Sequence, residues 1–159
     1  MRERFGASHA LKSPPHITLQ MPFRRNPTSE LTMIRELQQF ANNELVFPIK
    51  LSGFDCFSPR VIFVRVVNHR PIISLHTRLC ELLGSALGFN ENELNNRIHP
   101  HMTIATRDLS ADAFRIAWPE FENRPFNAAF QADCITLLKH NGKFWDVFKE
   151  FKFGKSKEA

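Results

Sequence analysis

The sequence contains no tyrosine, so no phenol is available for acid–base or nucleophilic catalysis, and these roles fall to other side chains. Its three cysteines, Cys56, Cys80 and Cys134, are widely spaced and form no Cys-x-x-Cys pair, which favours a reducing cytosol over a disulfide scaffold. No apolar run approaches the roughly 18–20 residues of a membrane span. The first 15 residues have no apolar core of a signal peptide. We therefore expect a cytoplasmic protein with no membrane contact.

The composition is that of a globular protein, with 43% hydrophobic and 23% charged residues in a chain of 159. This length predicts a single domain over residues 1–159 that buries a core without disulfides or metal. Lysine and arginine exceed aspartate and glutamate by 21 to 16, which gives a formal charge of +5. A basic surface of this size fits a phosphate-bearing ligand and fits an ordinary solvated surface equally well.

Short strands and helices alternate along the chain. Apolar runs predict strands at 15–23, 46–57, 61–67 and 100–106, and a hairpin of 126–139 with 143–153 that turns at Asn141-Gly142. Helical spacing predicts helices at 30–41, from Pro71 to Gly88, and from Ser110 to Trp118, where Pro119 should end the helix. No glycine-rich loop follows a strand, so nucleotide-triphosphate and dinucleotide folds lack support. The pattern predicts an α+β fold of antiparallel hairpins and helices.

One pattern occurs twice, 85 residues apart. Pro15-His16-Ile17-Thr18-Leu19 returns as Pro100-His101-Met102-Thr103-Ile104, and both have the form Pro-His-apolar-Thr-apolar. In a strand, residues i and i+2 share a face, so each histidine lies beside its threonine while the apolar residues turn to the core. An internal duplication would let the two polar faces line one groove from opposite sides.

Such a groove suits phosphoryl chemistry. One imidazole of the pair, His16 or His101, can take a proton from water while the other gives a proton to the leaving oxygen, because imidazole titrates near neutrality. The hydroxyls of Thr18 and Thr103 can donate to the phosphate oxygens as negative charge builds.

Two other interpretations compete with this one. Each histidine could simply bond to backbone on a half-buried strand, although a matched pair with matched threonines is hard to explain in that way. His99 and His101 could instead hold a metal, but no carboxylate or cysteine lies at ligand spacing near either motif. We expect no metal and no cofactor.

The two motifs resemble the paired His-x-Thr motifs of the 2H phosphoesterase superfamily, which includes 2'-5' RNA ligase-like proteins and RNA 2',3'-cyclic phosphodiesterases. The resemblance runs from about Phe5 to Phe153. It implies a two-lobed fold with pseudo-twofold symmetry, antiparallel sheets flanked by helices, and a metal-free site between the lobes. It implies that His16 and His101 are the catalytic imidazoles and that Thr18 and Thr103 bind the phosphate.

Residues after each motif strand could contact the substrate at the rim of the groove. Arg24, Arg25 and Arg107 could bind a flanking phosphate, and Phe23 could stack on a base. A core phenylalanine and surface arginines are the simpler alternative. The expected substrates are RNA ends or cyclic nucleotides, and the alternative function is a non-catalytic module that binds such ends.

The resemblance also implies a strand before the first motif, and the 15 residues ahead of His16 do not supply one. We therefore expect the first N-terminal strand to be missing and one edge of the strand at 16–22 to be open. Open strand edges recruit other strands, so self-association through this edge is expected.

Overall fold

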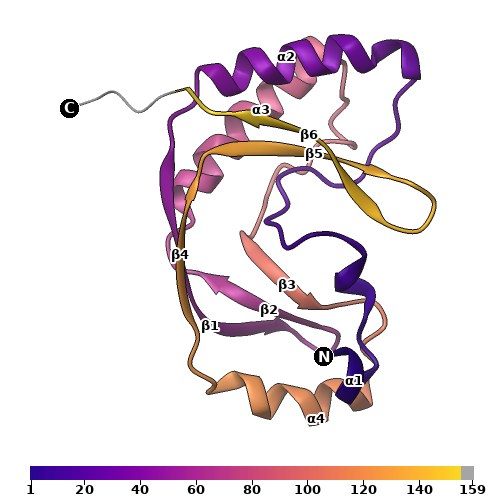
Figure 1. Ribbon diagram of the computed structural model, residues 1–159, viewed down its shortest axis with the longest axis vertical. Coiled ribbons are helices and arrows are strands. Elements are labelled where there is room, and N and C mark those ends of the chain that lie inside the picture. The colour runs from indigo at the N-terminus through magenta and orange to yellow at the C-terminus, as the bar shows by residue number, and fades with distance from the viewer. Residues whose placement is uncertain (155–159) are drawn as a thin grey trace.

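The computed structural model describes residues 1–154 and arranges them in two antiparallel sheets with helices above and below (Figure 1). The five residues at the end of the predicted domain 1–159 lie outside the described residues. The elements in chain order are α1 (Arg2–Phe5), two 3-10 turns (His9–Lys12 and Pro27–Ser29), α2 (Glu30–Asn42), β1 (Phe47–Phe57), β2 (Val61–Val66), α3 (Arg70–Leu87), β3 (His101–Ala105), α4 (Ala111–Glu122), β4 (Asn127–Ala132), β5 (Cys134–His140) and β6 (Trp145–Lys152).

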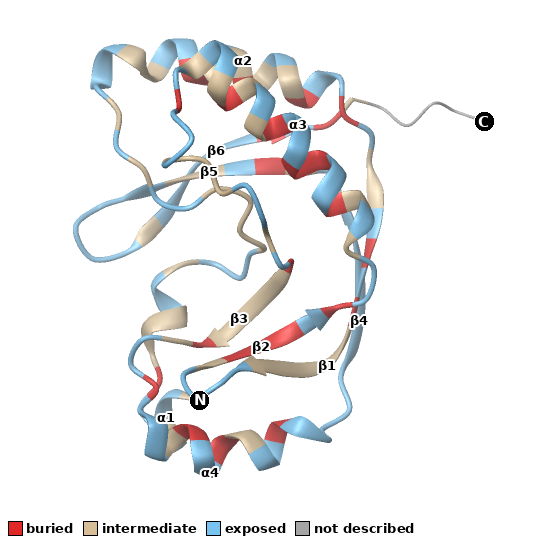
Figure 2. Cartoon of the chain, turned by 180° about the vertical axis from the view of Figure 1, so that it is seen from behind, coloured by how far each residue is buried: buried red, intermediate tan, exposed pale blue. Residues whose placement is uncertain are grey.

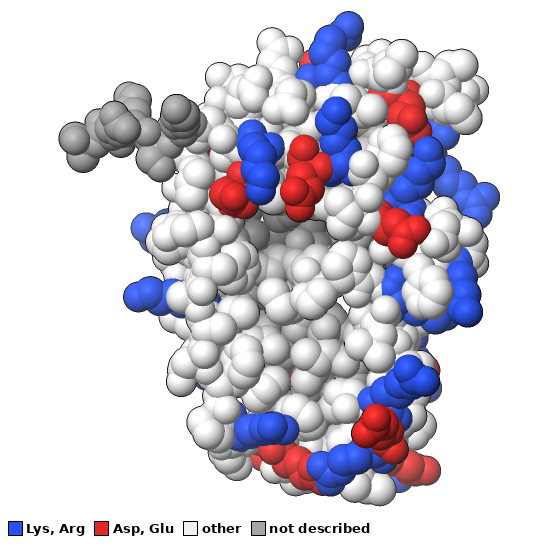
Figure 3. Space-filling model, in the orientation of Figure 1, with Lys and Arg blue, Asp and Glu red and all other residues white. Residues whose placement is uncertain are grey.

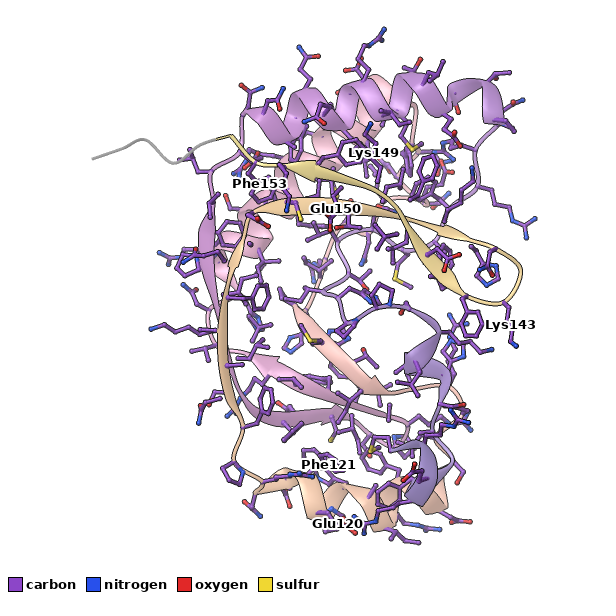
Figure 4. The ribbon with its side chains drawn as sticks, viewed as in Figure 1. Glu120, Phe121, Lys143, Lys149, Glu150 and Phe153 are labelled. Atoms are coloured by element: carbon purple, nitrogen blue, oxygen red, sulfur yellow. The ribbon has the colours of Figure 1, made fainter. Side chains whose placement is uncertain are left out.

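The larger sheet has four strands in the order β3-β2-β1-β4 and carries the second motif on its edge strand β3. Helix α4 covers one face of this sheet. Its Phe121 points from the helix toward the sheet (Figure 4) and meets Phe54 of β1 edge to face, with ring centroids 5.1 Å apart. Ser110 begins the helix, since its side-chain oxygen accepts a hydrogen bond from the backbone nitrogen of Ala113.

The smaller sheet is the β5–β6 hairpin, which is packed under helices α2 and α3 (Figure 1). Its turn contains the predicted Asn141-Gly142, and Gly142 has φ +100°, a conformation that glycine adopts without strain. Lys139 of β5 reaches Glu30 at the start of α2 at 2.9 Å. The buried core between these layers is made by Met33, Leu37, Ala41, Leu75, Leu79, Leu83, Phe89, Ile135, Phe151 and Phe153.

A further core cluster lies between the larger sheet and α3. It joins Ile49 and Leu51 of β1, Val64 and Val66 of β2 and Ile72 of α3. The buried segments of α2, α3, β2 and α4 turn toward the interior when the molecule is viewed from behind (Figure 2). This cluster adjoins the core under α2 and α3 through Leu19, Phe47 and Ala132, which pack against both.

Most predicted elements are confirmed within two or three residues. The helix predicted from Pro71 to Gly88 is α3, with Pro71 in its first turn and Gly88 as its left-handed end at φ +66°. The strands predicted at 46–57, 61–67 and 100–106 are β1, β2 and β3. The α+β class and the two lobes with helices on their outer sides are as expected, although one lobe has four strands and the other has two.

The strand predicted at 15–23 is wrong, because these residues pair with no strand of residues 1–154. An extended segment becomes a strand only when a neighbour takes its backbone N–H and C=O groups. Here β3 and β5 run nearby without forming a ladder with it, and Pro15 and Pro22 lack the N–H that a ladder needs. The absence of an upstream partner strand stays a prediction.

Two boundaries also differ from the prediction. Helix α4 runs past Pro119 to Glu122, because Phe121 continues the buried stripe of Phe114 and Ala117 and its burial outweighs the hydrogen bond that proline removes. The strand predicted at 126–139 is divided at Asp133 into β4, which pairs with β1, and β5, which pairs with β6. One chain segment thus passes from the first sheet to the second.

The edge expected at 16–22 is absent because these residues form no strand, so we predict that the protein self-associates through the hairpin of the smaller sheet instead. Within residues 1–154 neither β5 nor β6 pairs with a third strand. Free edges of this kind recruit another strand. Light scattering across a concentration series should show a dimer or larger species, and a strict monomer at every concentration would contradict the prediction.

Candidate active site

The first motif lies on an extended segment between the β5–β6 hairpin and β3, visible as the indigo-to-purple stretch in Figure 1. His16 is exposed, and its Nδ1 is 2.8 Å from the carbonyl oxygen of Pro14, with Ser13 Oγ at 3.4 Å. A carbonyl oxygen only accepts, so Nδ1 carries the hydrogen and donates it. The Nε2 atom of the neutral ring is then left with a free lone pair. Thr18, two residues on, is half-buried.

The second motif opens strand β3 and repeats this arrangement. His101 Nδ1 lies 2.5 Å from the carbonyl oxygen of His99, which again stands two residues before the motif histidine. His101 therefore also donates from Nδ1 and leaves Nε2 free. Thr103 follows on the same face of the strand and is half-buried.

Both motifs rest on the same interior. Ile17 of the first and Met102 of the second pack on the cluster that joins β1, β2 and α3, together with Leu19 and Ile104. The apolar positions thus point inward in both motifs, as the alternation predicted, even though the first motif is not a strand. The sequence-separated motifs are brought to one region of the fold. That His16 and His101 flank one phosphate stays a prediction.

Bonds from Gln20 and Arg25 to the 89–98 loop hold the first motif in place of a strand ladder. Gln20 donates from Nε2 to the backbone oxygen of Glu93 at 2.8 Å. Arg25 grips the Glu93 carboxylate with both Nη atoms, at 2.6 and 3.2 Å, and its guanidinium lies 3.7 Å from the centre of the Phe89 ring. The bonds from Arg25 and from the backbone of Asn90 lower the pKa of Glu93. Arg25 thus joins the segment after the first motif to the 89–98 loop. This structural role could not be predicted from its charge alone.

The other predicted substrate-binding residues lie at separate places. Phe23 meets Phe89 edge to face at 5.0 Å and packs on the core under α2 and α3, which is the simpler alternative for this residue. Arg24 and Arg107 are exposed, and Arg107 has φ +58° in the turn after β3. Contact of Phe23, Arg24 or Arg107 with a substrate stays a prediction.

Aromatic rings surround His101. Its ring centroid is 4.8 Å from that of Phe63 and 5.2 Å from that of Phe57, and His99 contacts the same two phenylalanines. His69, at the start of α3, meets His99 edge to face at 4.8 Å. Burial lowers the pKa of His99, and the charges of His69 and His101 lower it further. These causes favour the neutral form of His99 beside the motif histidine.

The turn after the second motif is tied to the N-terminal segment. Asp108 accepts hydrogen bonds from the backbone nitrogens of Ser8 and His9, both at 2.8 Å, and from Ser8 Oγ at 3.1 Å. Burial acts to raise the pKa of Asp108, but these hydrogen bonds outweigh it and hold the pKa below the ordinary value. Arg107 and Lys12 lie near His9 and, with burial, lower the pKa of His9.

The surface between the hairpin and the larger sheet is hollowed, and its floor is largely uncharged, with Lys, Arg, Asp and Glu side chains at the upper rim (Figure 3). Within residues 1–154 no three His, Cys, Asp or Glu side chains are grouped as ligands for a metal. No helix in that same stretch is long and apolar enough to cross a membrane. A shallow hollow of about 470 Å³ on β1 and β4 contains neither motif.

The model of the 2'-5' RNA ligase superfamily matches residues 1–144 of the chain. The chain belongs to this superfamily. It is 31% identical over 157 residues to a protein of Geobacillus thermodenitrificans that is provisionally named as a phosphoesterase, with 96% of this chain and 86% of that protein covered. A protein of Bacillus pumilus with the same name is 27% identical over 157 residues, with the same shares covered.

Two crystal structures have a similar fold. A protein of Thermus thermophilus matches 87% of this chain and 78% of its own, with a TM-score of 0.60 and 20% identity. A structure described as a phosphoesterase matches 88% of this chain and 77% of its own, with a TM-score of 0.59 and 19% identity. The chain thus shares the fold of these two proteins.

We predict that Asp108→Asn lowers the free energy of unfolding by about 1 kcal/mol at pH 7, since it weakens bonds to two backbone donors. The pKa of Asp108 is lowered in the folded protein, so its contribution is complete above its unfolded pKa and is lost as pH falls through the folded one. Urea unfolding of both proteins at pH 7 and pH 3 measures this, with Asp112→Asn as an exposed control. An unchanged difference at pH 3 would contradict the role of the ionised carboxylate.

Proposed function

We propose that the protein is a metal-independent phosphoesterase that hydrolyses, or reversibly forms, 2',3'-cyclic phosphate or 2',5'-phosphodiester bonds in RNA or nucleotides. Membership of the superfamily and the phosphoesterase names of the relatives support phosphoester chemistry. One observation carries the finer proposal: both motif histidines donate Nδ1–H to the carbonyl two residues earlier and leave Nε2 free.

This contact suits both charge states of the ring. Nδ1–H can donate to the carbonyl whether Nε2 is bare or protonated, so each imidazole can gain or lose a proton at Nε2 without turning. In hydrolysis, one neutral Nε2 takes a proton from the attacking water as the new P–O bond forms. The other histidine, protonated, gives its Nε2 proton to the oxygen that leaves as the old P–O bond breaks. Thr18 and Thr103 donate to the phosphate oxygens.

The enzyme is favoured over a non-catalytic module that binds RNA ends. Binding a phosphate calls for N–H donors and positive charge, and lysine, arginine or backbone amides supply these equally well. Two imidazoles with the same tautomer and a free Nε2 can take up and release protons, which binding a phosphate does not require. Which histidine is the acid and which the base follows from the side on which the leaving oxygen binds.

We predict that His16→Ala and His101→Ala each reduce turnover of a 2',3'-cyclic nucleotide by about 10²–10⁴-fold, the usual contribution of a positioned acid or base. Thr18→Ala and Thr103→Ala should cost less, about 10–10³-fold, because each removes one donor to the developing charge. Steady-state kinetics on a panel of 2',3'-cyclic nucleotides and 2',5'-linked dinucleotides gives these values.

The matched control is His140→Ala, which removes an exposed histidine from the hairpin turn and should leave turnover within about twofold. Full activity in His101→Ala would end the two-histidine mechanism. Equal losses in His140→Ala would mean that the fold, rather than the chemistry, responds to the substitutions.

The rate should depend on pH as a bell, since one histidine must start neutral and the other protonated. His16→Ala and His101→Ala should each remove one limb of the bell from the residual activity. Activity should survive EDTA, because the proposed mechanism moves protons through imidazoles alone. A loss in EDTA that zinc restores would contradict it.

A further inference from the structure

Arg65 is the charged residue within the apolar strand β2, and it lies directly opposite His101. Strand pairing places Arg65 across from His101 and Phe63 across from Thr103. Directly opposed residues of an antiparallel pair share a face and bring their Cβ atoms to about 4.5–5.5 Å. Arg65 therefore stands beside the second motif on the face that carries the imidazole, while Val64 and Met102 turn to the core on the other face.

A bulge in β1 seats the guanidinium. The register of β1 on β2 shifts between Leu51 and Phe54, and Gly53 within the shift has φ +65°. The exposed carbonyl of Ser52 accepts a hydrogen bond from Arg65 Nε at 3.1 Å. A Cβ built at Gly53 would stand 3.4 Å from Nη2, which places the guanidinium directly over the bulge.

The two Nη groups remain available to a ligand. Arg65 is exposed, and among residues 1–154 no carboxylate lies within 4 Å of it. The hydrogen bond through Nε fixes the plane of the guanidinium and leaves both terminal nitrogens to bind two oxygens of one phosphate. The guanidinium extends over β1, away from β3, and therefore leaves the imidazole of His101 uncovered.

The surface continues past Arg65 into the shallow hollow of about 470 Å³. Val67, two residues after Arg65 on the same face, lines this hollow with Lys50, Ser52 and Asn127. Ser52 is also the residue that anchors Arg65. The imidazole of His101, the guanidinium of Arg65 and the hollow thus lie in that order across one face of the larger sheet.

We infer that Arg65 binds the phosphate next to the reacting one, and that the substrate is an oligonucleotide whose preceding nucleoside occupies the hollow beside Lys50. This rests on the proposed function, since it takes His101 to mark the reacting phosphate. A cyclic mononucleotide has no second phosphate and gains nothing from Arg65. An RNA end gains one bidentate, charge-assisted contact.

The test compares a 2',3'-cyclic mononucleotide with a trinucleotide that ends in the same 2',3'-cyclic phosphate. In the unaltered protein kcat/KM should be higher for the trinucleotide, and rising salt should reduce it more steeply. Arg65→Gln should lower kcat/KM for the trinucleotide about 10–100-fold, mainly through KM, with a much smaller loss for the mononucleotide. Arg65→Lys should fall between the two, since it keeps the charge but not the forked geometry.

Arg35→Gln, on the outer side of α2, is the matched control and should leave the ratio between the two substrates unchanged. A binding experiment separates this inference from the proposed function: calorimetry with the mononucleotide and the trinucleotide that end in a 2'-phosphate. If no cyclic phosphate is turned over, the proposed function fails, but the trinucleotide should still bind more tightly and lose that advantage in Arg65→Gln. Equal affinities in the unaltered protein, or equal losses on both ligands in Arg65→Gln, would overturn the inference.

Discussion

The chemistry proposed for this protein depends on one contact made twice, the hydrogen bond from a histidine Nδ1 to the carbonyl two residues before it. At His16 the acceptor is Pro14 and at His101 it is His99. The contact spans only two residues, so the carbonyl that orients each histidine ring lies directly before its own motif. It fixes the tautomer and the direction of Nε2, and general acid–base catalysis needs both. The proposed mechanism further requires the two imidazoles to lie on either side of one phosphate.

The fold holds the two motifs in two different ways. The second motif is an ordinary edge strand, held by the ladder of β3 on β2. The first has no ladder, and it is held by the apolar contacts of Ile17 and Leu19 and by the bonds from Gln20 and Arg25 to Glu93. The first motif therefore depends on side-chain contacts, whereas the second depends on a backbone ladder.

The sequence predicted local features of the fold well and long-range features poorly. The ends of α3 followed from Pro71 and Gly88, and the hairpin turn followed from Asn141-Gly142, because these residues act through their own backbone preferences. The alternation of polar and apolar residues predicted that the apolar positions of both motifs face the core. Ile17 does pack on the core, although residues 15–23 form no strand. Features that depend on a distant partner were not predictable.

The strand at 15–23 is the clearest case, since a strand exists only where a neighbour completes it. The Arg25–Glu93 pair and the proximity of His69 to His99 join residues that no spacing rule connects. Arg65 did leave a signal, because a lone charge in the apolar run VIFVRVV marks the solvent face of a strand. Its position opposite His101 needed the register of β2 on β3, which the structure supplies.

The most direct test of the central claim is nitrogen NMR of the histidine rings, with signals assigned through His16→Gln and His101→Gln. Above the pH at which the rings lose their charge, both His16 and His101 should be in the Nδ1–H tautomer. On addition of a nucleotide 2'-phosphate, the Nε2 signals of both should move together while that of His140 stays still. An Nε2–H tautomer at either residue, or a response from only one of the two, would contradict the account.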